Sequence, residues 1–141
     1  MATASYLVDT GAIVAYLDRD DQWHKHCFAA YPHLPLPLLT STAVLTELFH
    51  MMSRRPVELA IVWRFVRSGA LAIGPITNED FPHLYSLMSQ YEDHPMDFAD
   101  ATLVRLAQRE SITRIFTVDA DFETYRIGGR RRFTIVPSTR P

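Results

Sequence analysis

The sequence contains one cysteine, one lysine and no long apolar run, and the first and last of these shortages each exclude a class of protein. Because Cys27 stands alone, no disulfide can form within the chain, which argues against a disulfide-stapled secreted domain. No segment approaches the roughly 20 consecutive apolar residues that cross a bilayer. The N-terminus also lacks the basic and apolar stretch of a secretory leader. We therefore expect a cytoplasmic protein that is not inserted in a membrane.

Lysine is almost absent, because Lys25 is the only one of the 14 Lys and Arg residues that is not arginine. The planar guanidinium of arginine suits bidentate contacts with phosphate. A coding bias towards arginine explains the same excess, and the formal net charge of −2 favours that explanation. Composition alone therefore does not indicate a nucleic-acid-binding protein.

Apolar residues make up 48% of the 141, enough for one globular domain, which we expect to span residues 1–141. Apolar runs of strand length lie at 5–8, 38–40, 70–73, 114–118 and 133–136. Segments with helical spacing lie between them, at 12–17, 22–31, 42–55, 57–66, 78–91 and 97–110. Ser41 or Thr42 is the expected cap of the third helix, which should end near Arg55-Pro56. The alternation predicts an α/β fold with helices on both faces of a mostly parallel sheet.

Two acidic residues directly follow predicted strands. Asp9 comes after the first apolar run and Asp119 after the fourth. A charge at such a place costs free energy unless a metal or a cationic group compensates it. In an open parallel sheet, ligands bind outside the carboxyl ends of the strands. We therefore expect Asp9 and Asp119 to converge on one site.

Three further acidic residues lie on predicted helices. Glu47 has apolar neighbours on both sides, so we expect it to point inward or towards a cleft. Asp97 and Asp100 are three residues apart at the start of a helix and share a face. In an alternative interpretation, these two only interact with the positive end of the helix dipole.

Several carboxylates at one edge of a sheet would repel each other unless cations were bound. All-oxygen sites of this kind select Mg²⁺ or Mn²⁺. Such an ion can polarise a phosphodiester, activate a bound water for attack and stabilise the departing 3′ oxygen. The acidic residues therefore predict metal-dependent phosphoryl chemistry that needs no protein nucleophile.

These acidic residues lie within four short segments whose order along the chain is informative. The segments are Leu7-Val8-Asp9-Thr10-Gly11, Ser41-Thr42-Ala43-Val44-Leu45-Thr46-Glu47-Leu48, Asp97-Phe98-Ala99-Asp100-Ala101-Thr102-Leu103-Val104 and Thr117-Val118-Asp119-Ala120-Asp121-Phe122. Together they resemble the PIN-domain nucleases, and more narrowly the VapC toxins of bacterial toxin–antitoxin pairs. Each segment alone is a weak signal, whereas the four in register are specific. The similarity covers nearly the whole chain.

The resemblance implies a three-layer α/β/α fold with a parallel sheet of about five strands. It also implies an endoribonuclease that depends on Mg²⁺ or Mn²⁺, forms a homodimer and is inhibited by a VapB-type antitoxin. Four residues correspond to the acids of the family's metal site and are the expected catalytic residues: Asp9, Glu47, Asp100 and Asp119. Two hydroxyl residues, Thr10 and Thr117, correspond to supports of that site. Asp97 and Asp121 are secondary or alternative ligands.

Other residues have both a functional and a structural interpretation. His24, His26 and Cys27 are of metal-ligand type but lack a fourth ligand at a recognisable spacing, which favours a surface helix. His50, three residues after Glu47, either lines the cleft or is a packing residue. A group of arginines follows the last acidic segment and either contacts the RNA backbone or only opposes nearby acids in a solvated loop. These arginines are Arg126, Arg130, Arg131 and Arg132.

Two other classes of phosphoryl-transfer protein are excluded by single positions. A haloacid-dehalogenase-type phosphatase needs a second aspartate two residues after the first, where this chain has Gly11. A phosphoacceptor receiver domain needs a lysine after its last strand, and Lys25 lies far from there in sequence. The remaining alternative is a catalytically inactive PIN-like scaffold that binds RNA or protein, and the presence of all four acids argues against it.

Overall fold

A five-stranded parallel sheet forms the centre of the computed structural model, which describes residues 3–138. Its strands are β1 (Tyr6–Val8), β2 (Leu38–Thr40), β3 (Leu71–Ile73), β4 (Arg114–Phe116) and β7 (Thr134–Val136). The spatial order is β3-β2-β1-β4-β7, and all four neighbouring pairs are parallel. The prediction of a mostly parallel sheet of about five strands is therefore confirmed.

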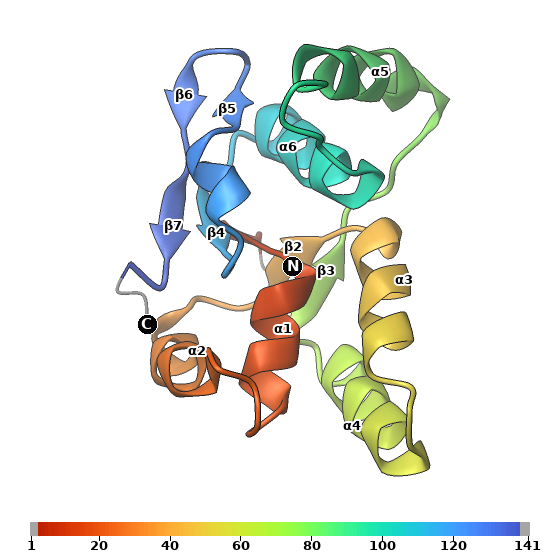
Figure 1. The fold of residues 1–141 in the computed structure, drawn as a ribbon, viewed down its shortest axis with the longest axis vertical. Helices are drawn as coiled ribbons and strands as arrows, with labels where there is room; N and C mark the ends of the chain where they lie inside the picture. The colour runs from red at the N-terminus through yellow and green to blue at the C-terminus, as the bar shows by residue number, and fades with distance from the viewer. Residues whose placement is uncertain (1–2, 139–141) are drawn as a thin grey trace.

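Six helices flank this sheet within the described residues (Figure 1). They are α1 (Thr10–Leu17), α2 (His24–Ala30), α3 (Thr42–Met51), α4 (Pro56–Arg67), α5 (Phe81–Gln90) and α6 (Phe98–Glu110). Helices α5 and α6 cover one face of the sheet, and α1 and α2 cover the other (Figure 1). Short 3-10 turns complete the chain, namely η1 (Tyr31–His33), η2 (Asn78–Asp80) and η3 (Ala120–Glu123).

Alternate residues of the central strands belong to two different cores. Leu7 and Ile115 pack in the core under α5 and α6, whereas Val8 and Phe116 pack in the core that contains α1 and α2. Successive side chains of a strand point to opposite faces, so a strand covered on both faces reads as a continuous apolar run. This is the physical basis of the three-layer α/β/α arrangement, and it confirms the predicted fold class.

The helix and strand limits differ from the predicted ones at a few places. Helix α3 begins after its cap Ser41, as predicted, but ends at Met51, earlier than predicted. Arg55 has an extended backbone before Pro56 and is the N-cap of the next helix, α4. Strand β4 ends at Phe116, two residues earlier than predicted. The first turn of the helix predicted at 78–91 is the 3-10 turn η2 rather than α-helix.

A small antiparallel hairpin, which we did not predict as strands, precedes β7. It consists of β5 (Arg126–Ile127) and β6 (Arg131–Arg132), joined by a turn at Gly128 and Gly129. Both glycines have positive φ angles, of 62° and 77°, which non-glycine residues rarely adopt. These two glycines therefore close the hairpin.

Among residues 3–138, no helix is long enough and apolar enough to cross a membrane.

Candidate metal centre

Three aspartates converge at the carboxyl edge of the sheet. Asp9 follows β1, Asp119 follows β4, and Asp100 lies in the first turn of α6. One carboxylate oxygen from each lies within 4.8 Å of the others. The convergence of Asp9 and Asp119 follows from topology, because β1 and β4 are parallel neighbours and end at the same edge.

Asp9 is held by two neutral donors. Its Oδ1 accepts a hydrogen bond from the backbone N–H of Thr10 at 2.8 Å, which makes Asp9 the N-cap of α1. Its Oδ2 accepts from the hydroxyl of Thr117 at 3.0 Å. The side chain is buried, and this burial raises the pKa of Asp9 to about 7, with further contributions from the negative charges of Asp119 and Glu47.

The pKa of Asp100 is raised in the same way, to about 8. Burial is the main cause, and the negative charges of Asp9 and Asp97 add to it. The Oδ2 of Asp100 accepts a hydrogen bond from the hydroxyl of Tyr125 at 3.0 Å. Two of the three clustered aspartates therefore have pKa values near neutrality.

Asp119 is linked to Asp9 through one hydroxyl group. The backbone N–H of Asp119 donates to Thr117 Oγ1 at 3.0 Å, and the same hydroxyl donates to Asp9. The Oδ1 of Asp119 accepts from the backbone N–H of Asp121 at 2.9 Å and caps η3. Thr117 thus supports the site directly, whereas the Thr10 hydroxyl donates to the carbonyl of Val44 at 3.3 Å and joins α1 to α3.

Glu47 lies on α3, outside the cluster of three aspartates. It is partly buried and, with Asp97 and Phe98, lines a cavity of about 460 Å³. Burial and the charge of Asp97 raise the pKa of Glu47. The structure therefore places three of the four predicted acids together and the fourth beside an adjoining cavity.

Asp97 and Asp121, predicted as secondary or alternative ligands, each have a partner. The Oδ1 of Asp97 accepts from the backbone N–H of Asp100 at 2.8 Å, so Asp97 is the N-cap of α6. The Oδ1 of Asp121 is 2.7 Å from His94 Nε2 at the surface. Neither residue belongs to the cluster of three aspartates.

The predicted RNA-contacting arginines lie on the η3–β5–β6 segment. The guanidinium of Arg126 donates to three consecutive backbone carbonyls, of residues 123–125, and so stabilises the end of η3. Arg130 and Arg131 line a cavity of about 250 Å³ together with Gln108 of α6. Gln108 lies eight residues after Asp100, or about 12 Å along the helix axis. Arg131 and Arg132 form the exposed strand β6.

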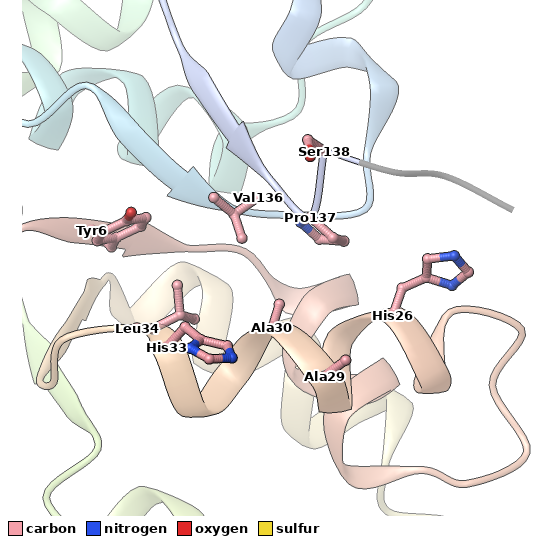
Figure 2. A pocket seen from close by; sticks show the side chains of 9 residues that line it. All are labelled: Tyr6, His26, Ala29, Ala30, His33, Leu34, Val136, Pro137 and Ser138. Carbon is pink, nitrogen blue, oxygen red and sulfur yellow. The ribbon is translucent and has the colours of Figure 1, made fainter.

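The histidines of α2 form no metal cluster with Cys27 among the described residues. Figure 2 shows His26 and His33 well apart on the lining of a cavity of about 460 Å³ that also includes Tyr6 and Pro137. Cys27 is buried, and this burial raises its pKa to about 12. His50 is exposed on the last turn of α3.

Sequence reasoning missed two contacts that shape the site. One is the hydrogen bond from Tyr125 to Asp100, which joins residues 25 positions apart and has no spacing signal. The other joins the hydroxyls of Ser41 and Thr102 at 2.8 Å and ties the start of α3 to α6. Ser41 and Thr102 both lie inside the motif segments. A threonine among the apolar residues of a predicted helix, as at position 102, needs a hydrogen-bond partner and could have pointed to this contact.

The residues present fit a divalent metal ion. The site offers carboxylate oxygens, and the groups of Thr10, Thr117 and Tyr125 that donate to Asp9 and Asp100 are neutral N–H and O–H groups rather than cations. Carboxylates this close would repel each other when ionised, and a bound cation would remove that cost. Hard oxygen ligands favour Mg²⁺ or Mn²⁺ over softer metals.

Comparison with known proteins gives one family match. The family model of the PIN domain matches residues 6–128. The curated protein Ribonuclease VapC26 of Mycobacterium tuberculosis is 28% identical over 135 residues, which cover 93% of this chain and 99% of that protein.

Solved structures of VapC proteins, alone and in VapBC complexes, are similar to this chain in fold. The crystal structure of Mycobacterium tuberculosis VapC20, a Sarcin-Ricin loop cleaving toxin, superposes with a TM-score of 0.79 at 20% identity and covers 90% of this chain and 99% of that one. VapBC2 from Rickettsia felis, bound to a DNA fragment from its promoter, superposes with a TM-score of 0.64 at 15% identity and covers 92% of this chain and 97% of that one. DNA-bound VapBC from Salmonella typhimurium superposes with a TM-score of 0.65 at 15% identity and covers 94% of this chain and 98% of that one.

Proposed function

The chain belongs to the PIN-domain family, and on this premise we propose that it is a metal-dependent endoribonuclease, the toxin of a VapBC-type toxin–antitoxin pair. The observation that carries the proposal is the cluster of Asp9, Asp100 and Asp119, whose carboxylate oxygens lie within 4.8 Å of one another. The relative Ribonuclease VapC26 supports the assignment to this class of nuclease.

In this proposal, the three clustered aspartates would hold Mg²⁺ or Mn²⁺, and the ion would supply Lewis-acid activation of water and charge neutralisation at the phosphodiester. Thr117 orients Asp9 and connects it to the backbone of Asp119. Glu47, which lines the neighbouring cavity together with Asp97, completes the proposed set of four catalytic acids. Burial, and to a smaller extent the negative charge of Asp97, raise the pKa of Glu47 above its ordinary value, so this carboxyl holds a proton more readily than a free glutamate does.

We further propose RNA as the substrate and the cytoplasm as the place of action. The exposed arginines Arg130, Arg131 and Arg132 remain candidates for backbone contact, and their place near the far end of α6 suits an RNA that extends beyond the cleavage site. Arg126 is a weaker candidate, because its guanidinium already binds three carbonyls.

Two protein partners belong to the proposal, a VapB-like antitoxin and a second copy of this chain. Large apolar side chains are exposed on several helices, α4 and α5 among them, and so offer surface for both contacts. Trp63 is 49% exposed on α4, and Tyr85 is 76% exposed on α5. The mass of the purified chain, measured by light scattering after size exclusion, should be that of a dimer. A monomer at micromolar concentration would contradict the homodimer.

The decisive experiment is cleavage of an end-labelled RNA panel by protein freed of any copurifying inhibitor. We expect cutting in Mn²⁺ that is lost in EDTA and in the Asp100→Asn variant. Asp93→Asn is the matched control, because Asp93 is an exposed aspartate outside the cluster, and it should cut like the parent. Protein that binds Mn²⁺ but cuts no RNA at stoichiometric amounts would favour the inactive scaffold instead.

A further inference from the structure

The hydroxyl of Tyr125 reaches the metal centre from inside the protein. The residue is fully buried, with 0% exposure, yet its hydroxyl donates to Asp100 Oδ2 at 3.0 Å. Tyr125 follows η3, the turn that Asp119 caps, whereas Asp100 lies on α6. The hydrogen bond therefore joins the two segments that carry Asp119 and Asp100.

Aromatic packing fixes the place of this hydroxyl. The Tyr125 ring makes edge contacts with Tyr91 and Phe122, both with centroids 5.1 Å apart, and Phe122 packs in turn against Phe133. The Tyr91 hydroxyl accepts from the backbone N–H of Arg126 at 2.9 Å, a contact separate from the one between Tyr125 and Asp100. Because neighbouring rings contact the Tyr125 ring on two sides, the ring has little room to tilt or shift, and its hydroxyl stays within hydrogen-bond distance of Asp100.

The arrangement parallels the hydrogen bond from Thr117 to Asp9. Each of the two buried carboxylates accepts one hydroxyl hydrogen bond, and both donors lie on the stretch 117–125. A hydroxyl orients a carboxylate without cancelling its negative charge. An arginine at either place would neutralise the carboxylate and compete with a bound cation.

We propose that Tyr125 is a positioning residue that orients the Asp100 carboxylate for the divalent cation and thereby sets the metal affinity of the site. It acts through Asp100 and does not contact the RNA. Groups that hydrogen-bond to metal ligands typically change metal affinity by tenfold or more when removed. This inference rests on the proposed metal centre.

The test is the affinity for Mn²⁺ of the Tyr125→Phe variant, measured by titration calorimetry with the full chain. We expect the dissociation constant to rise about tenfold relative to the parent. Tyr91→Phe is the matched control, because it removes a hydroxyl from the same aromatic cluster without touching a carboxylate. It should bind Mn²⁺ like the parent. Thermal unfolding in EDTA checks that both variants are folded.

A second measurement separates positioning from a general packing role. RNA cleavage by Tyr125→Phe should recover as the Mn²⁺ concentration is raised about tenfold, whereas a packing defect would lower activity at every concentration. Parent-like Mn²⁺ affinity in Tyr125→Phe, or an equal loss in Tyr91→Phe, would overturn the positioning role alone. If the parent binds no Mn²⁺, or if binding survives Asp100→Asn, the metal centre itself is wrong and the inference falls with it.

Discussion

Asp9→Asn should stabilise the metal-free protein at alkaline pH, although Asp9 is one of the best-bonded side chains at the site. The reason is the cost of holding an ionised carboxylate in a buried place. Asp9 is 7% exposed, and its pKa is raised from 3.8 to about 7. At about 1.4 kcal/mol for each pH unit, this shift corresponds to about 4 kcal/mol against the ionised form in the folded state.

The pH dependence follows from which state binds more protons. Between pH 3.8 and about 7, the folded protein keeps the Asp9 proton that the unfolded chain has lost, so stability falls as pH rises through this window. Above about pH 7, the full cost is present. Asparagine avoids this cost. Its side-chain amide has one oxygen in place of two, so it replaces only one of the two hydrogen bonds that Asp9 accepts, and this loss costs about 1 kcal/mol. The net gain should be about 2 to 3 kcal/mol at pH 8.

The assay is thermal unfolding followed by circular dichroism in EDTA. For a chain of this size, the gain corresponds to a rise in Tm of about 10 °C at pH 8, and the difference should shrink towards pH 4. Adding Mn²⁺ should raise the Tm of the parent but not that of Asp9→Asn, because a ligand that binds only the folded state stabilises it. An equal or lower Tm for Asp9→Asn in EDTA at pH 8 would refute the electrostatic reasoning. Asp93→Asn, at an exposed position, should leave the Tm unchanged.

Three further predictions concern other contacts of the fold. In Gly74→Ala, the new Cβ would lie 2.6 Å from Leu106 Cδ2, so we expect a loss of about 1 to 3 kcal/mol in urea unfolding. Asp80→Asn removes the buried partner of two arginines of α6 and should cost about 2 kcal/mol at pH 7; because the pKa of Asp80 is lowered to about 2, the difference should persist above pH 4 and disappear as pH falls towards 2. Thr117→Val removes the hydroxyl donor to Asp9 and should weaken Mn²⁺ binding about tenfold in calorimetry. An unchanged urea midpoint would contradict the prediction for Gly74→Ala, and a stability difference that does not depend on pH would contradict that for Asp80→Asn. An unchanged dissociation constant for Mn²⁺ would contradict the prediction for Thr117→Val.

Much of the fold could be predicted from local pattern. The buried strands appear as short apolar runs because both faces of the sheet are covered, and Leu38–Thr40 was predicted at its observed limits. Ser41 caps α3 as expected, because a serine before an apolar helix can accept the hydrogen bond of a first-turn N–H. The end of α3 was predicted too late, since Pro56 indicated only where the chain could not remain helical and not where the helix stopped.

The sequence also indicated that Asp9 and Asp119 could meet, because each follows a buried strand and the carboxyl ends of parallel strands lie at one edge of a sheet. The sequence did not determine which of the other acids join Asp9 and Asp119 in the cluster and which lie outside it. Tertiary structure placed Asp100 in the cluster and left Glu47 beside the adjoining cavity, and it gave Asp121 a partner in His94. These outcomes depend on how α3 and α6 pack on the sheet, which no local pattern records. The buried hydroxyl of Tyr125 is the clearest case, because its place is set by aromatic packing between segments far apart in the chain.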